Sequence, residues 1–219
     1  MESLLFDYGG TLDADGTTWA DRFYPLYKEA GIDVPRERFE RAFYDSEDAL
    51  ARRHRLAGLD LEATCRLQVR DTLAVLAPDR MDLVEPLAHR FASDSRKQFK
   101  RLAPVLERLS KRFKLGVVSN FYGNLDGILK AEGLRPLFTA VADSGVLGVT
   151  KPEAKIFLHA LEGRSPSACV MVGDSVKRDI AGAHALGMKK ALVCASGEAP
   201  KANQDWTIRS VVELEAVLS

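Results

Sequence analysis

The sequence predicts an α/β fold, a doubly wound parallel sheet with an all-helical insertion after its first strand. Three observations predict it. Five short apolar runs have the length of strands buried on both faces, and stretches with helical spacing of apolar residues separate the last four. Residues 17–97 carry helical patterns only. Hydrophobic residues make up 46% of the 219 residues, enough to build a buried core.

The apolar runs and the helical stretches alternate in a fixed order along the core. The predicted strands are Ser3–Phe6, Leu115–Val118, Ala140–Ala142, Ala168–Val172 and Lys190–Cys194. The predicted helices of this part are Leu102–Phe113, Leu125–Glu132, Pro152–Leu161 and Val176–Leu186. Such alternation indicates a parallel sheet covered by helices on both faces. In a sheet of this kind the functional site lies at the carboxyl ends of the strands.

The insertion reads as four helices, Trp19–Ala30, Arg36–Leu56, Asp60–Leu76 and Met81–Phe99. We therefore expect a core formed by residues 1–16 and 98–219, and a helical subdomain formed by residues 17–97. The polar and basic segment Ser93–Leu102 is expected to be the return linker. The aromatic residues of the first helix have helical spacing, so we expect them to pack inside the insertion; they are Trp19, Phe23, Tyr24 and Tyr27.

Charge and hydropathy limit the partners of the chain. The 31 basic and 31 acidic residues balance, which argues against a nucleic-acid surface. The first ten residues carry no charged-then-apolar export signal, and no apolar stretch approaches the ~18 residues needed to span a bilayer. These features favour a soluble, cytoplasmic protein that binds neither nucleic acid nor membrane, and they leave its oligomeric state open.

Six polar residues lie at or just after the predicted strand ends or in the following turns: Asp7, Thr11, Ser119, Lys151, Asp174 and Asp179. Each has an ordinary explanation when taken alone, such as a turn aspartate, a helix N-cap or a solvated lysine. A carboxylate in a sharp turn can also be a nucleophile. All six in this order, each near a strand end, are far less expected by chance. The set indicates a site that handles an anion.

The chain resembles the haloacid dehalogenase-like (HAD) hydrolase superfamily over essentially its whole length. The motifs that carry the resemblance are Phe6-Asp7-Tyr8-Gly9-Gly10-Thr11-Leu12, Val117-Val118-Ser119-Asn120, Val149-Thr150-Lys151-Pro152, and Gly173-Asp174-Ser175 with Asp179 and Gly182-Ala183. The resemblance implies a Rossmann-like core and identifies the insertion as a helical cap of the C1 type. It also implies a phosphohydrolase that acts on a small phosphorylated metabolite.

The resemblance implies a role for each site residue. Asp7 would attack phosphorus and become an aspartyl-phosphate, while Thr11 and Ser119 would donate hydrogen bonds to phosphoryl oxygens and Lys151 would neutralise their charge. Asp7, Asp174 and the backbone carbonyl of Gly9 would hold Mg²⁺. Asp179 and Asn120 would stand behind these groups, with Asp179 orienting Lys151 or a metal-bound water. Phosphoryl transfer depends on such positioning and electrostatics.

The chain departs from the family pattern at Gly9, where most phosphatases of the family carry an aspartate that protonates the leaving alcohol. General acid–base catalysis is worth about 10²–10⁴-fold, so the activity is expected to be weakened or specialised. A substrate with a good leaving group would need no acid. Another acid could otherwise substitute, and the candidates are Asp13, Asp15, Asp45, Glu47 and Asp48.

Three other interpretations stay open. The family's phosphonate hydrolases use a cap lysine, but the cap stretch Tyr44–Leu59 contains none. The haloacid dehalogenases also lack the second aspartate, but the pair Gly173-Asp174 counts against them. The chain could also be a phosphate-binding relative with little turnover. In the cap, Arg52, Arg53 and Arg55 either recognise a substrate anion or form a solvated helix face; adjacent helical residues point in different directions, which favours the second.

Overall fold

The computed structural model describes residues 1–197 and 202–218. Its six strands form one parallel sheet in the order β3-β2-β1-β4-β5-β6. They are β1 (Ser3–Phe6), β2 (Lys114–Ser119), β3 (Ala140–Asp143), β4 (Cys169–Gly173), β5 (Lys189–Val193) and β6 (Trp206–Ile208). The predicted α/β fold with a doubly wound, Rossmann-like sheet is thus confirmed. The sequence pattern did not predict β6, a three-residue strand at the edge of the sheet.

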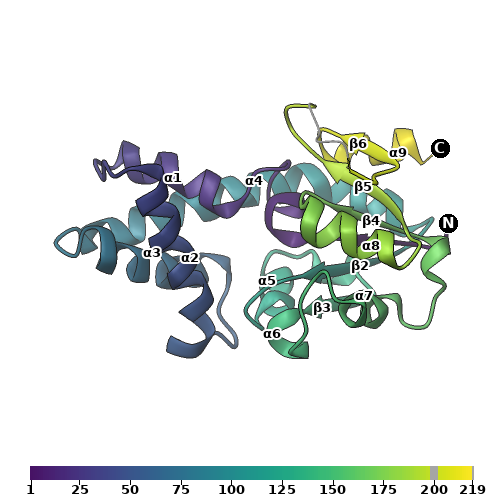
Figure 1. The fold of residues 1–219 in the computed structure, drawn as a ribbon, viewed down its shortest axis with the longest axis horizontal. Coiled ribbons are helices and arrows are strands. Elements are labelled where there is room, and N and C mark those ends of the chain that lie inside the picture. The colour runs from purple at the N-terminus through teal and green to yellow at the C-terminus, as the bar shows by residue number, and fades with distance from the viewer. Residues whose placement is uncertain (198–201, 219) are drawn as a thin grey trace.

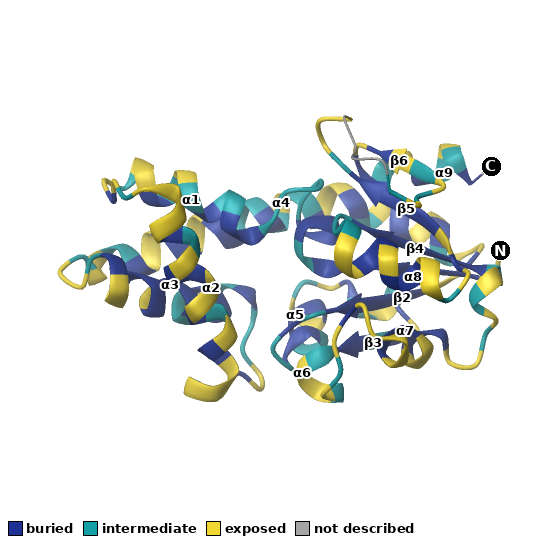
Figure 2. Cartoon of the chain, in the orientation of Figure 1, coloured by how far each residue is buried: buried dark blue, intermediate teal, exposed yellow. Residues whose placement is uncertain are grey.

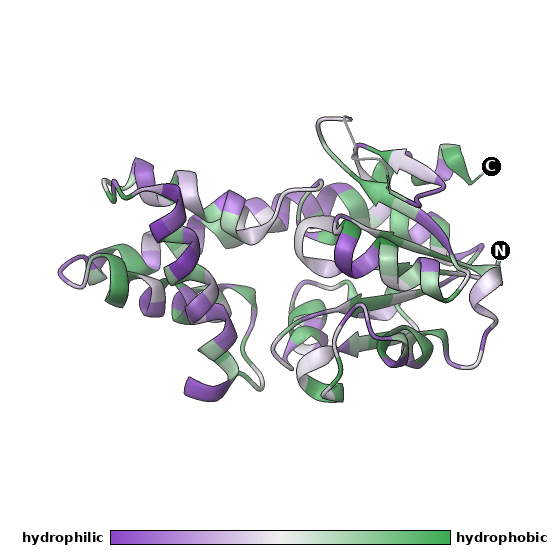
Figure 3. Ribbon diagram, in the orientation of Figure 1, coloured by the Kyte–Doolittle hydropathy of each residue, from purple (hydrophilic) through white to green (hydrophobic). Residues whose placement is uncertain are grey.

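The strands are buried on both faces because helices cover both sides of the sheet (Figures 1 and 2). Side chains alternate between the faces. Leu4 and Phe6 of β1 pack into one apolar cluster with Leu106 of the long helix α4, whereas Leu5 packs into a second cluster with Phe157. Figure 3 shows the same strands as the most hydrophobic part of the core. Burial on two faces explains why the strand runs are almost wholly apolar.

The helices of the insertion are α1 (Trp19–Glu29), α2 (Arg36–Arg53), α3 (Leu61–Leu76) and the first half of α4 (Val84–Ser110), which the short turn η2 (Met81–Leu83) precedes. They pack on one another beside the sheet, and both chain termini lie at the opposite end of the molecule (Figure 1). Within residues 1–197 and 202–218, no helix combines the length and apolar character that crossing a membrane requires.

The predicted return linker was wrong, because Ser93–Leu102 lies inside the 27-residue helix α4. The segment is polar on its outer side only. Phe91, Ser95, Phe99 and Leu102 are buried at helical spacing and continue the apolar stripe from the insertion into the core. A continuous helix therefore crosses the expected domain boundary between residues 97 and 98.

The remaining elements connect the strands and place the site. They are η1 (Tyr8–Leu12), α5 (Leu125–Ala131), η3 (Arg135–Leu137), α6 (Ser144–Leu147), α7 (Ala154–Leu161), η4 (Pro166–Ala168), η5 (Val176–Ile180), α8 (Ala181–Ala185), η6 (Val211–Glu213) and α9 (Leu214–Val217). The predicted helix over Val176–Leu186 is divided into η5 and α8. The predicted helix over Leu102–Phe113 is the second half of α4.

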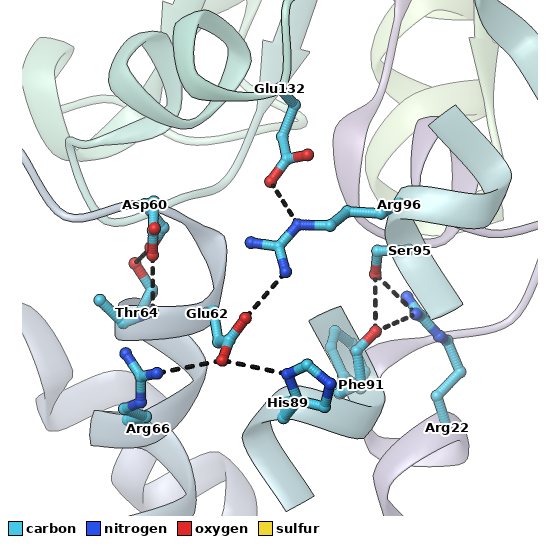
Figure 4. A network of polar contacts seen from close by, with 11 residues as sticks. Arg22, Asp60, Glu62, Thr64, Arg66, His89, Phe91, Ser95, Arg96 and Glu132 are labelled. Carbon is cyan, nitrogen blue, oxygen red and sulfur yellow. Dashed lines mark hydrogen bonds and ion pairs between the residues drawn. The ribbon is translucent and has the colours of Figure 1, made fainter. Parts of the chain in front are cut away.

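An ion-pair network ties the insertion to the core (Figure 4). Arg96 of α4 lies between Glu62 of α3, at 2.8 Å from Nη1, and Glu132 at the end of α5, at 3.1 Å from Nε. Asn124, in the loop before α5, donates from Nδ2 to the hydroxyl of Thr64 at 2.8 Å. These contacts hold the helical insertion over the carboxyl ends of the strands.

Candidate active site

The site lies where the order of the strands reverses. β1 and β4 are neighbours in the sheet, and the chain leaves them toward opposite edges. A crevice at the carboxyl ends of two such strands is where open α/β sheets bind ligands. Asp7 directly follows β1, Asp174 directly follows β4, and Ser119 ends the adjacent strand β2. The topology therefore brings Asp7 together with two side chains that lie more than one hundred residues further along the chain.

Lys151 is the cation at the centre of this crevice. It is 3% exposed, and its Nζ lies 2.7 Å from Asp7 Oδ1 and 2.7 Å from Asp179 Oδ1. Burial alone would lower the pKa of Lys151, but the charges of Asp179 and Asp7 outweigh it and raise the pKa above its ordinary value. The two carboxylates therefore favour the charged form of Lys151. One ammonium bridges two buried carboxylates.

Asp7 receives three donors on one oxygen. The backbone N–H of Tyr8 donates to Oδ1 at 2.6 Å, the Ser119 hydroxyl donates at 3.0 Å, and Lys151 Nζ lies 2.7 Å away. Within the described part of the chain, the second oxygen, Oδ2, has no hydrogen-bond partner. Asp7 also lines the cavity described below. Its carboxylate is thus held rigidly with one oxygen uncommitted.

Asp174 is the second carboxylate of the crevice, and it lies against Gly10. Gly10 has φ +84°, and a Cβ built there would lie 2.7 Å from Asp174 Oδ2, so the close approach requires glycine. Thr11, which is fully buried, donates its hydroxyl to Asp174 Oδ1 at 3.0 Å. Burial, and after it the charges of Asp7 and Asp179, raise the pKa of Asp174 to about 8.

Three carboxylates therefore share one ammonium. Ligand atoms from Asp7, Asp174 and Asp179 lie within 4.8 Å of one another. After burial, the negative charges of Asp7 and Asp179 contribute most to the raised pKa of Asp174. Carboxylate oxygens in such a cluster suit a hard divalent cation. The residues present therefore fit a metal such as Mg²⁺.

Asp179 and Asn120 position Lys151 from behind. Asp179 is fully buried, and its Oδ2 accepts the backbone N–H of Ser175 at 2.9 Å while Oδ1 faces Lys151. The Asn120 side chain accepts from the Lys151 N–H at 2.7 Å and donates to the Lys151 carbonyl at 3.2 Å. Both contacts fix the lysine without exposing Asp179 to the cavity.

A cavity of about 90 Å³ opens above these groups, between the core and the insertion. Its floor is formed by Asp7, Gly9, Ser119, Asn120, Lys151 and Asp174. Its walls are Thr18, Trp19, Ala20, Phe43, Tyr44, Glu47, Phe121, Tyr122 and Arg178. The volume holds several water molecules, so it fits a small anionic group.

Gly9 lies close to the indole ring of Trp19 at the edge of this cavity. Its φ and ψ are −72° and 121°, a conformation open to any residue, so the backbone does not require glycine there. A Cβ at this position would lie 3.4 Å from Nε1 of Trp19. The prediction that Trp19 serves packing alone was incomplete: Trp19 packs against Phe23 and also forms a wall of the site.

The five candidate replacements for the missing acid lie in different surroundings. Asp13 is buried against Arg22, at 2.7 Å, and accepts from Trp19 Nε1 at 2.7 Å, so its carboxylate is occupied. Asp15 is bound by Arg101 and by Gln98. Asp45 and Asp48 are exposed on α2 and do not line the cavity. Glu47 does line it.

None of Arg52, Arg53 and Arg55 lines the cavity, which favours the solvated helix face over the weaker alternative of a substrate contact. They lie at the end of α2 and just beyond it, and Arg53 is paired with Asp71 of α3 at 3.5 Å. Arg178 of η5 lines the cavity instead. Its position one residue before Asp179 in the fourth motif was the only sequence signal for it.

Comparisons with known proteins agree in the kind of fold and chemistry. A family model described as haloacid dehalogenase-like hydrolase matches residues 1–187. The chain is 40% identical over 129 residues to haloacid dehalogenase-like hydrolase domain-containing protein 3 of Bos taurus, which covers 57% of this chain and 49% of that protein. Identity to the Danio rerio protein of the same name is 30% over 208 residues, covering 87% and 84%.

A further relative and two solved structures are also similar. Pyrimidine 5'-nucleotidase YjjG of Escherichia coli (strain K12) is 33% identical over 124 residues, or 52% of this chain and 53% of that protein. A HAD phosphatase from Thermococcus onnurineus is 27% identical with a TM-score of 0.64, covering 100% and 98%. A 2-haloacid dehalogenase from Pseudomonas syringae pv. Tomato DC3000 is 26% identical with a TM-score of 0.57, at the same coverage. The chain thus spans about half the length of the bovine relative and nearly all of both solved chains.

Proposed function

The chain belongs to the haloacid dehalogenase-like hydrolase family, and from that premise we propose that it is a Mg²⁺-dependent phosphohydrolase of a small phosphorylated metabolite. The observation that carries the proposal is the bridge from Lys151 to Asp7 and Asp179 beside the third carboxylate, Asp174. In this proposal residues 17–97 act as a cap over the core.

The reaction begins with Asp7. Its carboxylate attacks phosphorus, the bond to the leaving oxygen breaks, and the phosphoryl group is held as an aspartyl-phosphate until water releases it. Lys151 and the Ser119 hydroxyl contact the Asp7 carboxylate. In the reaction Lys151 would neutralise charge on the phosphoryl oxygens, and Ser119 would donate a hydrogen bond to them. Fixed donors and cations of this kind supply most of the catalysis in phosphoryl transfer.

Mg²⁺ would be held by Asp7, Asp174 and the Gly9 carbonyl, and it would neutralise the charge of the phosphate. Thr11 donates to Asp174 in this structure and does not line the cavity. We therefore assign Thr11 to orienting Asp174, in place of the phosphoryl contact that the family resemblance implied. Asp179 and Asn120 keep Lys151 in position.

Two other functions have specific observations behind them. One of the similar structures is a 2-haloacid dehalogenase, but substrates of that class are carboxylates, and three clustered carboxylates with one lysine favour a site that includes a cation. The missing side chain at Gly9 favours a phosphate-binding relative with little turnover. Turnover on a panel of phosphoesters and acyl phosphates, with and without Mg²⁺, separates these three functions.

Metal binding has a test that needs no turnover. Mg²⁺ with tetrafluoroberyllate, a phosphate mimic, is expected to raise the melting temperature, because a ligand that binds only the folded state stabilises it. Asp174→Ala is expected to abolish this rise, whereas Asp79→Ala, a change at an exposed acid outside the site, should keep it. An unchanged melting curve of the parent protein at saturating additions would contradict the proposed metal site.

The same linkage depends on pH through Asp174. Its folded-state pKa of about 8 lies above its unfolded value, about 3.9. Without a cation, the stability gained by protonating Asp174 is therefore complete below about pH 4 and is lost as the pH rises through about 8. Mg²⁺ binds the ionised carboxylate, so its effect on the melting temperature should be larger at pH 8.5 than at pH 6. An equal effect at the two pH values would contradict a coupling between metal binding and the raised pKa of Asp174.

A further inference from the structure

Gly9 leaves the proposed reaction without its usual proton donor. Within the described residues, Glu47 is the carboxyl of the cavity lining that the proposed nucleophile and metal ligands do not use. We propose that Glu47 of α2 donates the proton to the leaving oxygen and later accepts a proton from the attacking water. This inference rests on the function proposed above. It selects one residue from the five acids that the sequence alone could not separate.

The first argument is position. Glu47 lines the same cavity as Asp7, Ser119 and Lys151, although it comes from the cap and they come from the core. Asp13 and Asp15 are occupied by arginine partners, and Asp45 and Asp48 are exposed. In the proposed reaction the core residues bind the phosphoryl group, so an acid from the cap is the one that would meet the leaving group.

The second argument is orientation. The Tyr122 hydroxyl, from the loop after β2, donates to Glu47 Oε1 at 2.7 Å. Among the residues that the structure describes, the other oxygen, Oε2, has no hydrogen-bond partner. Tyr122 therefore fixes the carboxyl while one oxygen remains available to a ligand. A catalytic acid needs both features, since proton transfer requires a defined position and an uncommitted atom.

The third argument is the surroundings of the carboxyl. Phe43 and Tyr44 flank it in the cavity wall. Burial raises the pKa of Glu47; the Tyr122 hydrogen bond and the charge of Arg178 oppose the rise, and Asp48 adds to it. Tyr44 is the other titratable group of the wall on α2. Burial thus favours the protonated form of the Glu47 carboxyl, the form that a general acid needs.

The proton balance closes over both steps. As Asp7 bonds to phosphorus and the bond from phosphorus to the leaving oxygen breaks, the Glu47 proton moves to that oxygen and an alcohol departs. Glu47 is then a carboxylate. It takes one proton from the water that attacks the aspartyl-phosphate, and this step regenerates the Asp7 carboxylate and releases phosphate. The cycle needs no further reactant.

The test compares two leaving groups. An alkyl phosphate needs a proton on its leaving oxygen, whereas nitrophenyl phosphate does not. Glu47→Gln keeps the shape and can still pair with Tyr122. We expect Glu47→Gln to lower kcat for the alkyl phosphate by about 10-fold or more, which is the usual effect of losing a general acid. The rate of the first turnover of nitrophenyl phosphate should change by less than about threefold, because its leaving group needs no proton. The control is Asp45→Asn, which removes an exposed carboxylate from the same helix outside the cavity and should change neither.

Two further variants separate catalysis from a merely structural contact. Gly9→Asp, made in the Glu47→Gln protein, should restore alkyl phosphate turnover, because the Gly9 backbone accepts aspartate. Tyr122→Phe removes a hydrogen bond that favours the ionised Glu47, so its pKa should rise. The loss of alkyl phosphate turnover at high pH should then move to higher pH. Melting temperatures of all variants verify folding.

Each outcome decides one of the two proposals. If the parent hydrolyses both substrates and Glu47→Gln slows both equally, or neither, Glu47 is not the proton donor and the proposed function stands. A pH profile that Tyr122→Phe leaves unmoved would likewise overturn the role of Glu47. If the parent hydrolyses no phosphoester or acyl phosphate with Mg²⁺, the phosphohydrolase itself is wrong, and the inference fails with it.

Discussion

Asp7→Asn is expected to reduce Mg²⁺-dependent hydrolysis by about 10⁴-fold or more, to the background rate. The amide has nearly the shape of the carboxylate, but it cannot form a stable acyl phosphate. Its oxygen can still accept from the Tyr8 N–H and the Ser119 hydroxyl, which lie 2.6 and 3.0 Å from Asp7 Oδ1. The fold should therefore survive. Steady-state rates on several phosphoesters measure the loss, and circular dichroism with melting curves checks the fold.

Two controls sharpen this result. Asp126→Asn replaces a half-buried acid of α5 that pairs with Lys130 and lies outside the cavity, and it should leave turnover unchanged. Mass spectrometry of a rapidly quenched parent reaction should place a phosphoryl group on the peptide that contains Asp7. If purified Asp7→Asn kept the parental Mg²⁺-dependent rate, the covalent mechanism would be wrong and the rate would belong to a contaminant.

Lys151→Met is expected to cost the folded protein about 3–5 kcal/mol, the usual penalty for leaving a buried charge unpaired. Methionine has a similar length but no charge, so Asp179, which is fully buried, loses its partner. For a chain of this size the melting temperature should fall by roughly 10 °C. Turnover should vanish as well, because the phosphate loses its fixed cation. The melting curves should be measured in the presence of a metal chelator, because no bound metal ion can then replace the charge of the lysine.

The reason for that loss can be tested by removing the unpaired charge. Asp179→Asn in the Lys151→Met protein should recover part of the stability, because the amide needs no counter-charge. Lys155→Met, at an exposed position of α7, should change the melting temperature little. Equal stability of parent and Lys151→Met in chelator would show that the bridge from Lys151 to Asp7 and Asp179 contributes nothing to folding.

Local patterns were sufficient to place the strands. β1 coincides with the predicted Ser3–Phe6, and the ends of β2 to β5 lie within one residue of the prediction. Each of these strands is buried on both faces, so its residues form a short apolar run that little else in a soluble chain produces. The edge strand β6 lacks that pattern, since Trp206 is half-buried and Thr207 is exposed.

The linker error shows the limit of reading polarity along the chain. Ser93–Leu102 appears polar in sequence, but its buried residues, such as Ser95 and Phe99, recur at helical spacing. A helix with one face exposed to solvent and the other face buried can have the same composition as a linker. Only the position of the residues that pack against α4 distinguishes the two.

The sequence by itself determined the α/β fold and the residues that meet at the carboxyl edge of the sheet, because strand ends and sharp turns are local features. Asp7, Ser119, Lys151, Asp174 and Asp179 are found together as predicted. The tertiary structure alone decided what surrounds them. Glu47, Trp19 and Arg178 line the cavity and Arg52 does not. This difference depends on how the insertion packs over the core, through contacts such as those of Arg96 and Tyr122. Those contacts join segments that are far apart in the chain, so the periodicity of residues within one segment cannot predict them.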